Sequence, residues 1–175
     1  MKTKKYLAVV IFGLLALSCS VIDNLFTFSV DNETSVTIPA GFPVNIPFEL
    51  NKEIASNSST VFENNKTKAE LVKEVRIKEM KLTITNPTDK TFSFLKSIHM
   101  YISASDGSDE IELAFLDDIN STSNIINLTC TPEKLDKYIK ASSFKLRARV
   151  VTKETITQNV TVKAEMKFQV TADPF

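Results

Sequence analysis

Residues 160–170 read VTVKAEMKFQV, and this stretch decides the fold class of the chain. Apolar and polar side chains alternate through the whole stretch, which is a period of two. Because successive side chains of a strand point to opposite faces of a sheet, the pattern predicts a long strand with one face in a core and the other in solvent.

The same alternation recurs across most of the chain, in residues 26–30, 44–50, 80–84, 98–102, 111–115 and 144–150. Asp106-Gly107 lies between two of these segments and predicts a hairpin. Pro47 cannot donate a ladder hydrogen bond, so its strand is expected at a sheet edge or at a bulge. Residues 51–68 are polar and are expected to form one long crossover loop.

Two short helices are expected among the strands. Thr131 and Pro132 have the residue types of an N-cap and a first helical position, followed by apolar residues at helical spacing. The second helix is expected over residues 67–75, because Leu71, Val72 and Val75 fall on one helical face. The sequence therefore predicts an all-β fold: an antiparallel two-sheet sandwich, immunoglobulin-like, with one or two short helices. A closed barrel is the alternative.

The first twenty residues have the features of an export signal. Three lysines within the first five residues precede an apolar run of about 11 residues, from Leu7 to Leu17. Such a run is too short to cross a bilayer, which takes roughly 20 residues. An ordinary secretory signal cut near Ala16 or Ser18 is one interpretation.

The run Leu15-Ala16-Leu17-Ser18-Cys19 resembles the lipobox of bacterial lipoproteins. The resemblance implies a signal peptide over residues 1–18, an acylated Cys19 as the first residue of the mature chain, and attachment to a membrane through its acyl chains. Ser20 follows the cysteine, where lipoproteins kept in the inner membrane often carry Asp. By resemblance, we expect an outer-membrane location on the periplasmic face of the cell envelope.

Residues 19–24 then form the lipidated cysteine and a short tether, and residues 25–175 form a single β-sandwich domain. The five residues from Ser20 to Asn24 reach at most about 17 Å, so the domain is expected to lie close to its membrane. Without residues 1–18 the chain has 18 basic and 21 acidic side chains, a net charge of −3. This weakly acidic balance argues against nucleic-acid binding.

Few residues have the types or spacing of an active site. His99 is the single histidine, and its alternation with Ile98 and Met100 places it on the same face as Tyr101, as a surface or edge residue. A zinc site built from Cys and His lacks ligands, and glycines are too few for a phosphate loop. We expect no catalytic residue, no metal site and no cofactor.

Two binding hypotheses remain open at this point. The acidic hairpin Asp106–Glu110, with Asp117 and Asp118 beyond the next strand, could gather around Ca²⁺, although its spacing is not that of an EF-hand. The second hypothesis is sugar binding, which commonly uses exposed Trp and Tyr. Because this chain has no Trp, the sequence weakens this hypothesis without excluding it.

The sequence favours a non-catalytic, membrane-anchored lipoprotein that acts by contact, as a partner-binding or envelope-structural module. Its partners are then the membrane, through the acyl anchor on Cys19, and an envelope protein. Whether it binds a small-molecule ligand is unknown from the sequence. The edge near Pro47 and the hairpin at residues 106–109 are the expected contact surfaces. The alternative is a carrier of lipid or another apolar ligand, which requires an enclosed cavity of several hundred Å³.

Overall fold

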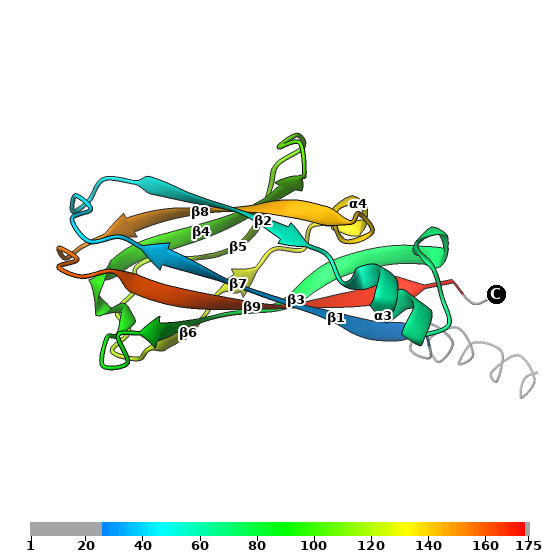
Figure 1. The fold of residues 1–175 in the computed structure, drawn as a ribbon, viewed down its shortest axis with the longest axis horizontal. Coiled ribbons are helices and arrows are strands. Elements are labelled where there is room, and N and C mark those ends of the chain that lie inside the picture. The colour runs from blue at the N-terminus through cyan, green and yellow to red at the C-terminus, as the bar shows by residue number, and fades with distance from the viewer. Residues whose placement is uncertain (1–25, 174–175) are drawn as a thin grey trace, which may run out of the picture.

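The computed structural model describes residues 26–173, in which nine strands form two antiparallel sheets packed face to face (Figure 1). The four-stranded sheet has the order β1-β9-β3-β6, with bounds Thr27–Ile38, Val160–Ala172, Val72–Asn86 and Ile125–Asn127. The five-stranded sheet has the order β2-β8-β4-β5-β7, with bounds Phe48–Ala55, Ser143–Thr152, Leu95–Ala104, Ile111–Leu116 and Thr129–Cys130. The predicted antiparallel two-sheet sandwich is confirmed.

The strand pairs are nested in the sequence. β1 pairs with β9, β2 with β8, β3 with β6, and β4 with β5. This is a long antiparallel ribbon folded at the β4–β5 hairpin and rolled up, which is the double Greek key of a jelly roll. An immunoglobulin sandwich instead has sheets in the order ABED and CFG. The connectivity therefore refines the expected immunoglobulin-like arrangement to a jelly roll.

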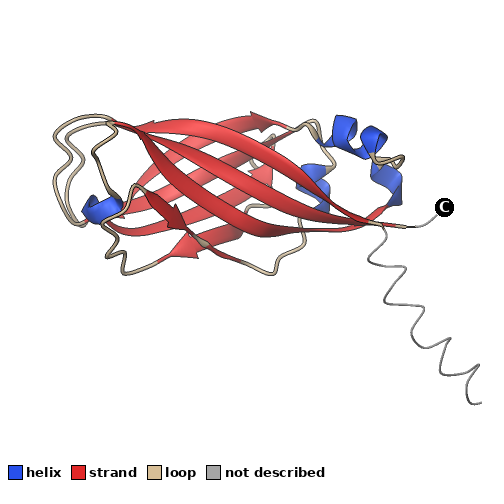
Figure 2. Cartoon of the chain, turned by 90° about the horizontal axis from the view of Figure 1, so that it is seen from below, coloured by secondary structure: helices blue, strands red, loops and turns tan. Residues whose placement is uncertain are grey.

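The two sheets face each other (Figure 2), and the core lies between them, with members that the alternation predicts. Every second residue of β9 is buried, from Val160 to Ala172. Phe168 of β9 and Phe144 of β8 are fully buried and meet edge to face, with ring centroids 6.5 Å apart. This contact joins the two sheets across the core, near the start of β8.

β2 is an edge strand of the five-stranded sheet, as Pro47 predicts. The strand is shorter at its start than the alternation suggests, because Val44 and Ile46 precede it and Ile46 is 55% exposed. Pro47 lacks a backbone donor, and Asn45 has a φ of 61°, outside the strand region. Inside the strand, Lys52 lies on the inward-facing side between apolar residues, which discourages edge-to-edge association.

The expected loop over residues 51–68 is wrong in two places. β2 continues to Ala55, and the helix α3 spans Ser58–Asn64. Phe62 of α3 is buried against Phe28 of β1, with ring centroids 5.9 Å apart. A seven-residue helix is unstable alone, so this docking contact is what holds it.

The expected helix over residues 67–75 is also wrong. Only Ala69–Leu71 forms a single 3-10 turn (η1), and β3 begins at Val72. A register shift between Val72 and Glu74 adds one residue to β3, so that Val72 and Val75 both face the core. The bulge therefore produces a spacing of three that resembles helical periodicity.

The helix near residue 131 exists but starts later than expected. α4 spans Asp136–Ile139, and its buried residues include Tyr138 and Ile139, as the spacing predicts. Thr131 does not cap it, because the N-cap position is Leu135; the Thr131 hydroxyl donates instead to the Glu112 carbonyl of β5 at 2.8 Å. A second 3-10 turn, η2, spans Phe92–Phe94.

The two ends of the sandwich differ. Phe26 accepts a backbone hydrogen bond from Ala172, so the first described residue lies beside the end of β9. α3 and α4 lie at this same end, while the loops at residues 39–47 and 153–159 lie at the opposite end (Figure 1). Within residues 26–173, no helix is long and apolar enough to span a bilayer.

The predicted hairpin turn is confirmed at Gly107, which has a φ of +90°. We expect Gly107→Ala to destabilise the domain by about 1–2 kcal/mol, since a Cβ disfavours the left-handed region. The nearest atom to such a Cβ would be Lys145 Nζ at 3.9 Å, so the cost is conformational and not steric. Urea unfolding of Gly107→Ala measures it, and a loss below about 0.3 kcal/mol would contradict this explanation.

Candidate functional site

A small void lies in the interior of the sandwich, within residues 26–173. Its volume is about 40 Å³, and it is lined mainly by apolar residues of both sheets, together with Thr34 and Lys52 of the two edge strands. Ligand sites for drug-sized molecules typically enclose about 300–1,000 Å³. The void therefore has room for no more than a fragment of an acyl chain.

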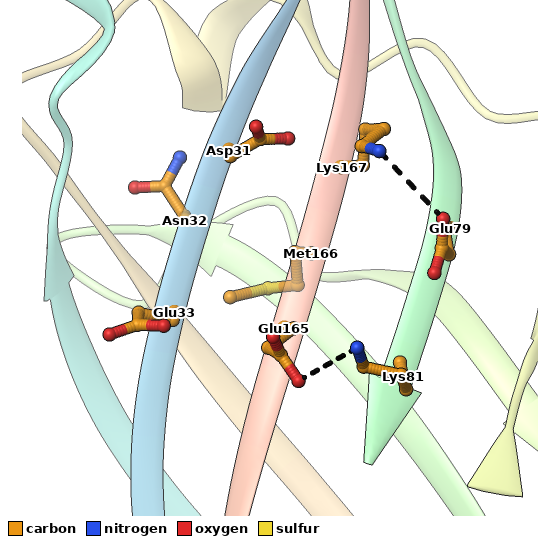
Figure 3. A pocket seen from close by; sticks show the side chains of 8 residues that line it. All are labelled: Asp31, Asn32, Glu33, Glu79, Lys81, Glu165, Met166 and Lys167. Carbon is orange, nitrogen blue, oxygen red and sulfur yellow. Dashed lines mark ion pairs between the residues drawn. The ribbon is translucent and has the colours of Figure 1, made fainter. Parts of the chain in front are cut away.

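The outer face of the four-stranded sheet carries a hollow of about 390 Å³ (Figure 3). It is lined by Asp31, Asn32 and Glu33 of β1, Glu165, Met166 and Lys167 of β9, and Glu79 and Lys81 of β3. Lys81 Nζ lies 3.1 Å from Glu165, and Lys167 Nζ lies 4.0 Å from Glu79. Charges that alternate and pair across strands are typical of a solvated sheet face, and we assign no site to this hollow.

The outer face of the five-stranded sheet is different, because aromatic and arginine side chains gather on it. Cross-strand register places Arg149 of β8 between Glu49 of β2 and His99 of β4, with Phe115 of β5 beyond. Two of the three arginines of the chain, Arg147 and Arg149, lie on this face. The surface also includes Tyr101 and Ser97 of β4 and Val151 of β8. We call the surface formed by all of these residues the arginine face.

Arg147 is the centre of one network on the arginine face. Its Nε and Nη2 donate to the two oxygens of Glu110 at 2.8 and 2.5 Å, and its Nη1 donates to Glu49 at 2.6 Å. The guanidinium also lies over the Tyr101 ring, 4.2 Å from its centroid. The hydrogen bond to Glu110 raises the pKa of Arg147 further, and the same bond lowers the pKa of Glu110. Arg147 is therefore a fixed, fully charged part of the face.

His99 is the centre of a second network. Its Nδ1 lies 2.6 Å from Glu112 and its Nε2 lies 3.2 Å from Asp117. The ring stacks on Phe115, with centroids 5.8 Å apart. Because a neutral imidazole has one N–H, two hydrogen bonds to carboxylates require the protonated ring. The sequence correctly places His99 beside Tyr101 but does not indicate its two acidic partners.

Partial burial lowers the pKa of His99, but the hydrogen bonds to Glu112 and Asp117 outweigh it and raise the pKa above its ordinary value. The stability from this cluster is thus fully present below the unfolded pKa of about 6.5 and is lost as pH rises through the folded pKa. We expect Asp117→Asn to lower the pKa of His99, measured by NMR titration of the ring protons. Asp118→Asn is the matched control, and an equal effect of both variants would contradict the assignment.

Arg149 is left without a partner by these networks. Its cross-strand neighbour Glu49 bonds to Arg147 instead. Among residues 26–173, neither the Arg149 guanidinium nor the hydroxyls of Ser97 and Tyr101 have a side-chain hydrogen-bond or ion-pair partner. These three side chains line one hollow of about 200 Å³, together with His99 and Val151. The hollow is therefore rich in unused donors.

The acidic residues considered for calcium do not converge. Asp106 accepts hydrogen bonds from the Ser108 backbone N–H and hydroxyl, Asp109 pairs with Lys137 at 2.9 Å, and Glu110 pairs with Arg147. Asp117 lies on the other side of the hairpin, against His99. Within residues 26–173, no three His, Cys, Asp or Glu side chains gather as a metal site. The calcium hypothesis therefore has no support from the geometry.

The two cysteines have different places. Cys130 is unpaired and half-buried in β7, and burial raises the pKa of its thiol, in keeping with a small apolar residue. Cys19, the predicted lipidation site, lies outside the described residues.

Comparisons with known proteins find no match to any family model and none to a curated protein. Solved structures of similar fold include the decameric BFDV capsid protein, with 11% identity over 85% of this chain and 99% of that chain and a TM-score of 0.43. A xylan-binding module, CBM15, has 13% identity over 85% of this chain and 100% of that chain and a TM-score of 0.39. At such identities and TM-scores, these similarities carry no argument about function.

Proposed function

We propose that this chain is a non-catalytic lipoprotein of the cell envelope, held at a membrane through Cys19, that acts by contacting a protein partner with its arginine face. The observation that carries the proposal is the gathering of Arg147, Arg149, Tyr101 and Phe115 on one solvent-facing sheet surface. Arginine and tyrosine are enriched among the residues that dominate binding energy at protein interfaces. No comparable group lies in the hollow of the opposite sheet, within the described residues.

The state of His99 supports a non-catalytic role. A general base needs a free ring nitrogen within reach of a substrate proton. Both nitrogens of His99 already contact carboxylates, and its neighbour Ser97 has no hydrogen bond to it among the described residues. The cluster is therefore arranged to hold a charge in place on the surface.

The packing of the core favours contact over transport. A lipid carrier needs an enclosed apolar cavity of several hundred Å³, and the interior void is about 40 Å³. The solid core between two sheets makes the domain a rigid support for its outer faces. We therefore place the contact function ahead of the carrier alternative.

The position of Phe26 suggests how the domain is oriented. A short tether from Cys19 would bring the end that carries α3 and α4 to the membrane surface, with the loops at residues 39–47 pointing away from it. β1, with 12 residues, extends along the domain for roughly 40 Å at about 3.4 Å per residue. The strands would then run roughly along the membrane normal. The arginine face would be perpendicular to the membrane plane and open to a partner in the periplasm.

Photo-crosslinking in the native envelope tests the contact function. A benzoylphenylalanine is placed at Phe115 on the arginine face or at Thr83 on the outer face of the four-stranded sheet, both of which are half-buried strand positions. The proposal predicts a crosslinked protein from position 115 and far less from position 83. Equal yields, or a partner captured only from position 83, would refute it.

A further inference from the structure

From the hollow beside Arg149 we infer that the partner presents a carboxylate, from an Asp or Glu side chain or a chain end, which binds the Arg149 guanidinium. The inference rests on the proposed contact function and names the chemistry of that contact. A guanidinium has donors in a planar fork that matches the two oxygens of a carboxylate. Arg149 is exposed, and among residues 26–173 its guanidinium has no partner.

The acidic side chains of this surface already form ion pairs with Arg147 or His99. Glu49 and Glu110 bind Arg147, and Glu112 and Asp117 bind His99. Arg149 is thus the cation of the arginine face whose charge is not balanced by a contact. A carboxylate from outside the chain supplies the missing acceptor.

The lining of the hollow fits a carboxylate on a short stem. Ser97 and Tyr101 contribute two hydroxyl donors, and Val151 contributes an apolar wall. Its volume of about 200 Å³ is below that of sites for drug-sized ligands and suits a single side chain. The donors would bind the carboxylate oxygens, and the apolar wall would contact the stem that carries them.

Charge favours a monoanion over a doubly charged phosphate. When His99 is protonated it lies between two carboxylates, so this cluster then carries one net negative charge next to the hollow. That charge repels a dianion more strongly than a monoanion, and Arg149 provides one positive charge against it. A phosphorylated segment is therefore a poorer fit than an acidic one.

The test uses the full chain in its native envelope with the photo-crosslinker at Phe115, which lies on the arginine face and does not line the hollow. Arg149→Glu is expected to lower the crosslink yield at least about tenfold, because it replaces a charge-assisted hydrogen bond with repulsion. Arg149→Lys is expected to keep part of the yield, since it keeps the charge but loses the fork. Lys167→Glu, an exposed charge reversal on the opposite sheet, is the control and should leave the yield unchanged.

A charge swap makes the test specific. Mass spectrometry of the crosslinked peptide identifies the acidic residues of the partner. When the acid that binds Arg149 is changed to Lys in the partner, the crosslink yield of the Arg149→Glu variant should be restored. If position 115 still captures a protein but Arg149→Glu has no effect, or if the captured segment has no carboxylate, the inference falls while the contact function stands. A captured glycan or lipid, or no capture at all, would overturn both.

Discussion

A Cys19→Ala variant is expected to move almost completely from the membrane fraction to the soluble fraction. Each acyl CH₂ group buried in the bilayer contributes about 0.8 kcal/mol, so chains on one sulfur atom hold a protein nearly permanently. The change is not expected to alter the unfolding transition, because the core lies within residues 26–173. Membrane fractionation, followed by thermal unfolding of the released protein, measures both results.

Cys130→Ala is the matched control for this variant. Cys130 is half-buried in β7, so its loss is expected to lower stability slightly and to leave the protein in the membrane fraction. Release of both variants, or of neither, would mean that Cys19 does not carry the anchor.

The second large effect is expected from Phe168→Ala, which should lower the free energy of unfolding by about 3–5 kcal/mol. Phe168 is 0% exposed and lies in β9 between Val30 of β1 and Ile77 of β3. Its ring also packs on Phe144 across the sandwich. Truncation therefore opens a cavity where the two sheets meet, and domains of this size are stable by only about 5–15 kcal/mol.

Ile46→Ala controls for the loss of an apolar side chain as such. Ile46 is 55% exposed in the loop before β2, so its truncation is expected to change stability by less than about 0.5 kcal/mol. Urea unfolding of both variants, with the slope of the transition compared, gives the two values. Similar losses in both would mean that Phe168 does not join the sheets as described.

The sequence predicts the strands well because the physical signal is local. A strand with one buried face must alternate, and residues 160–170 do so without a break. A bulge interrupts the alternation. The extra residue between Val72 and Glu74 puts Val72 and Val75 on the same face of β3, which resembles a helical spacing. No local pattern marks α3, because it is held by the contact of Phe62 with Phe28 of β1, a strand distant in the sequence.

The order of the strands is not a local property. Alternation shows which side of a strand is buried, but any of several neighbours satisfies that requirement, and the jelly-roll order depends on which strands pair. The immunoglobulin-like arrangement and the jelly roll therefore share the same sequence signal.

The site was predictable in part. Alternation correctly gives the shared face of His99 and Tyr101 and the outward direction of Arg147 and Arg149. The hairpin at Gly107 indicates that β5 returns beside β4, but it does not indicate which side chains of β5 contact His99. The register shift between Met100 and Tyr101 brings Glu112 next to His99, and no sequence pattern marks that shift.

The intact mass of the mature protein extracted from membranes tests most directly the claim that this domain works from a lipid anchor. The account predicts a polypeptide that begins at Cys19 and carries added acyl mass on that residue. A chain with an unmodified thiol at Cys19, or one that begins at another residue, would contradict it.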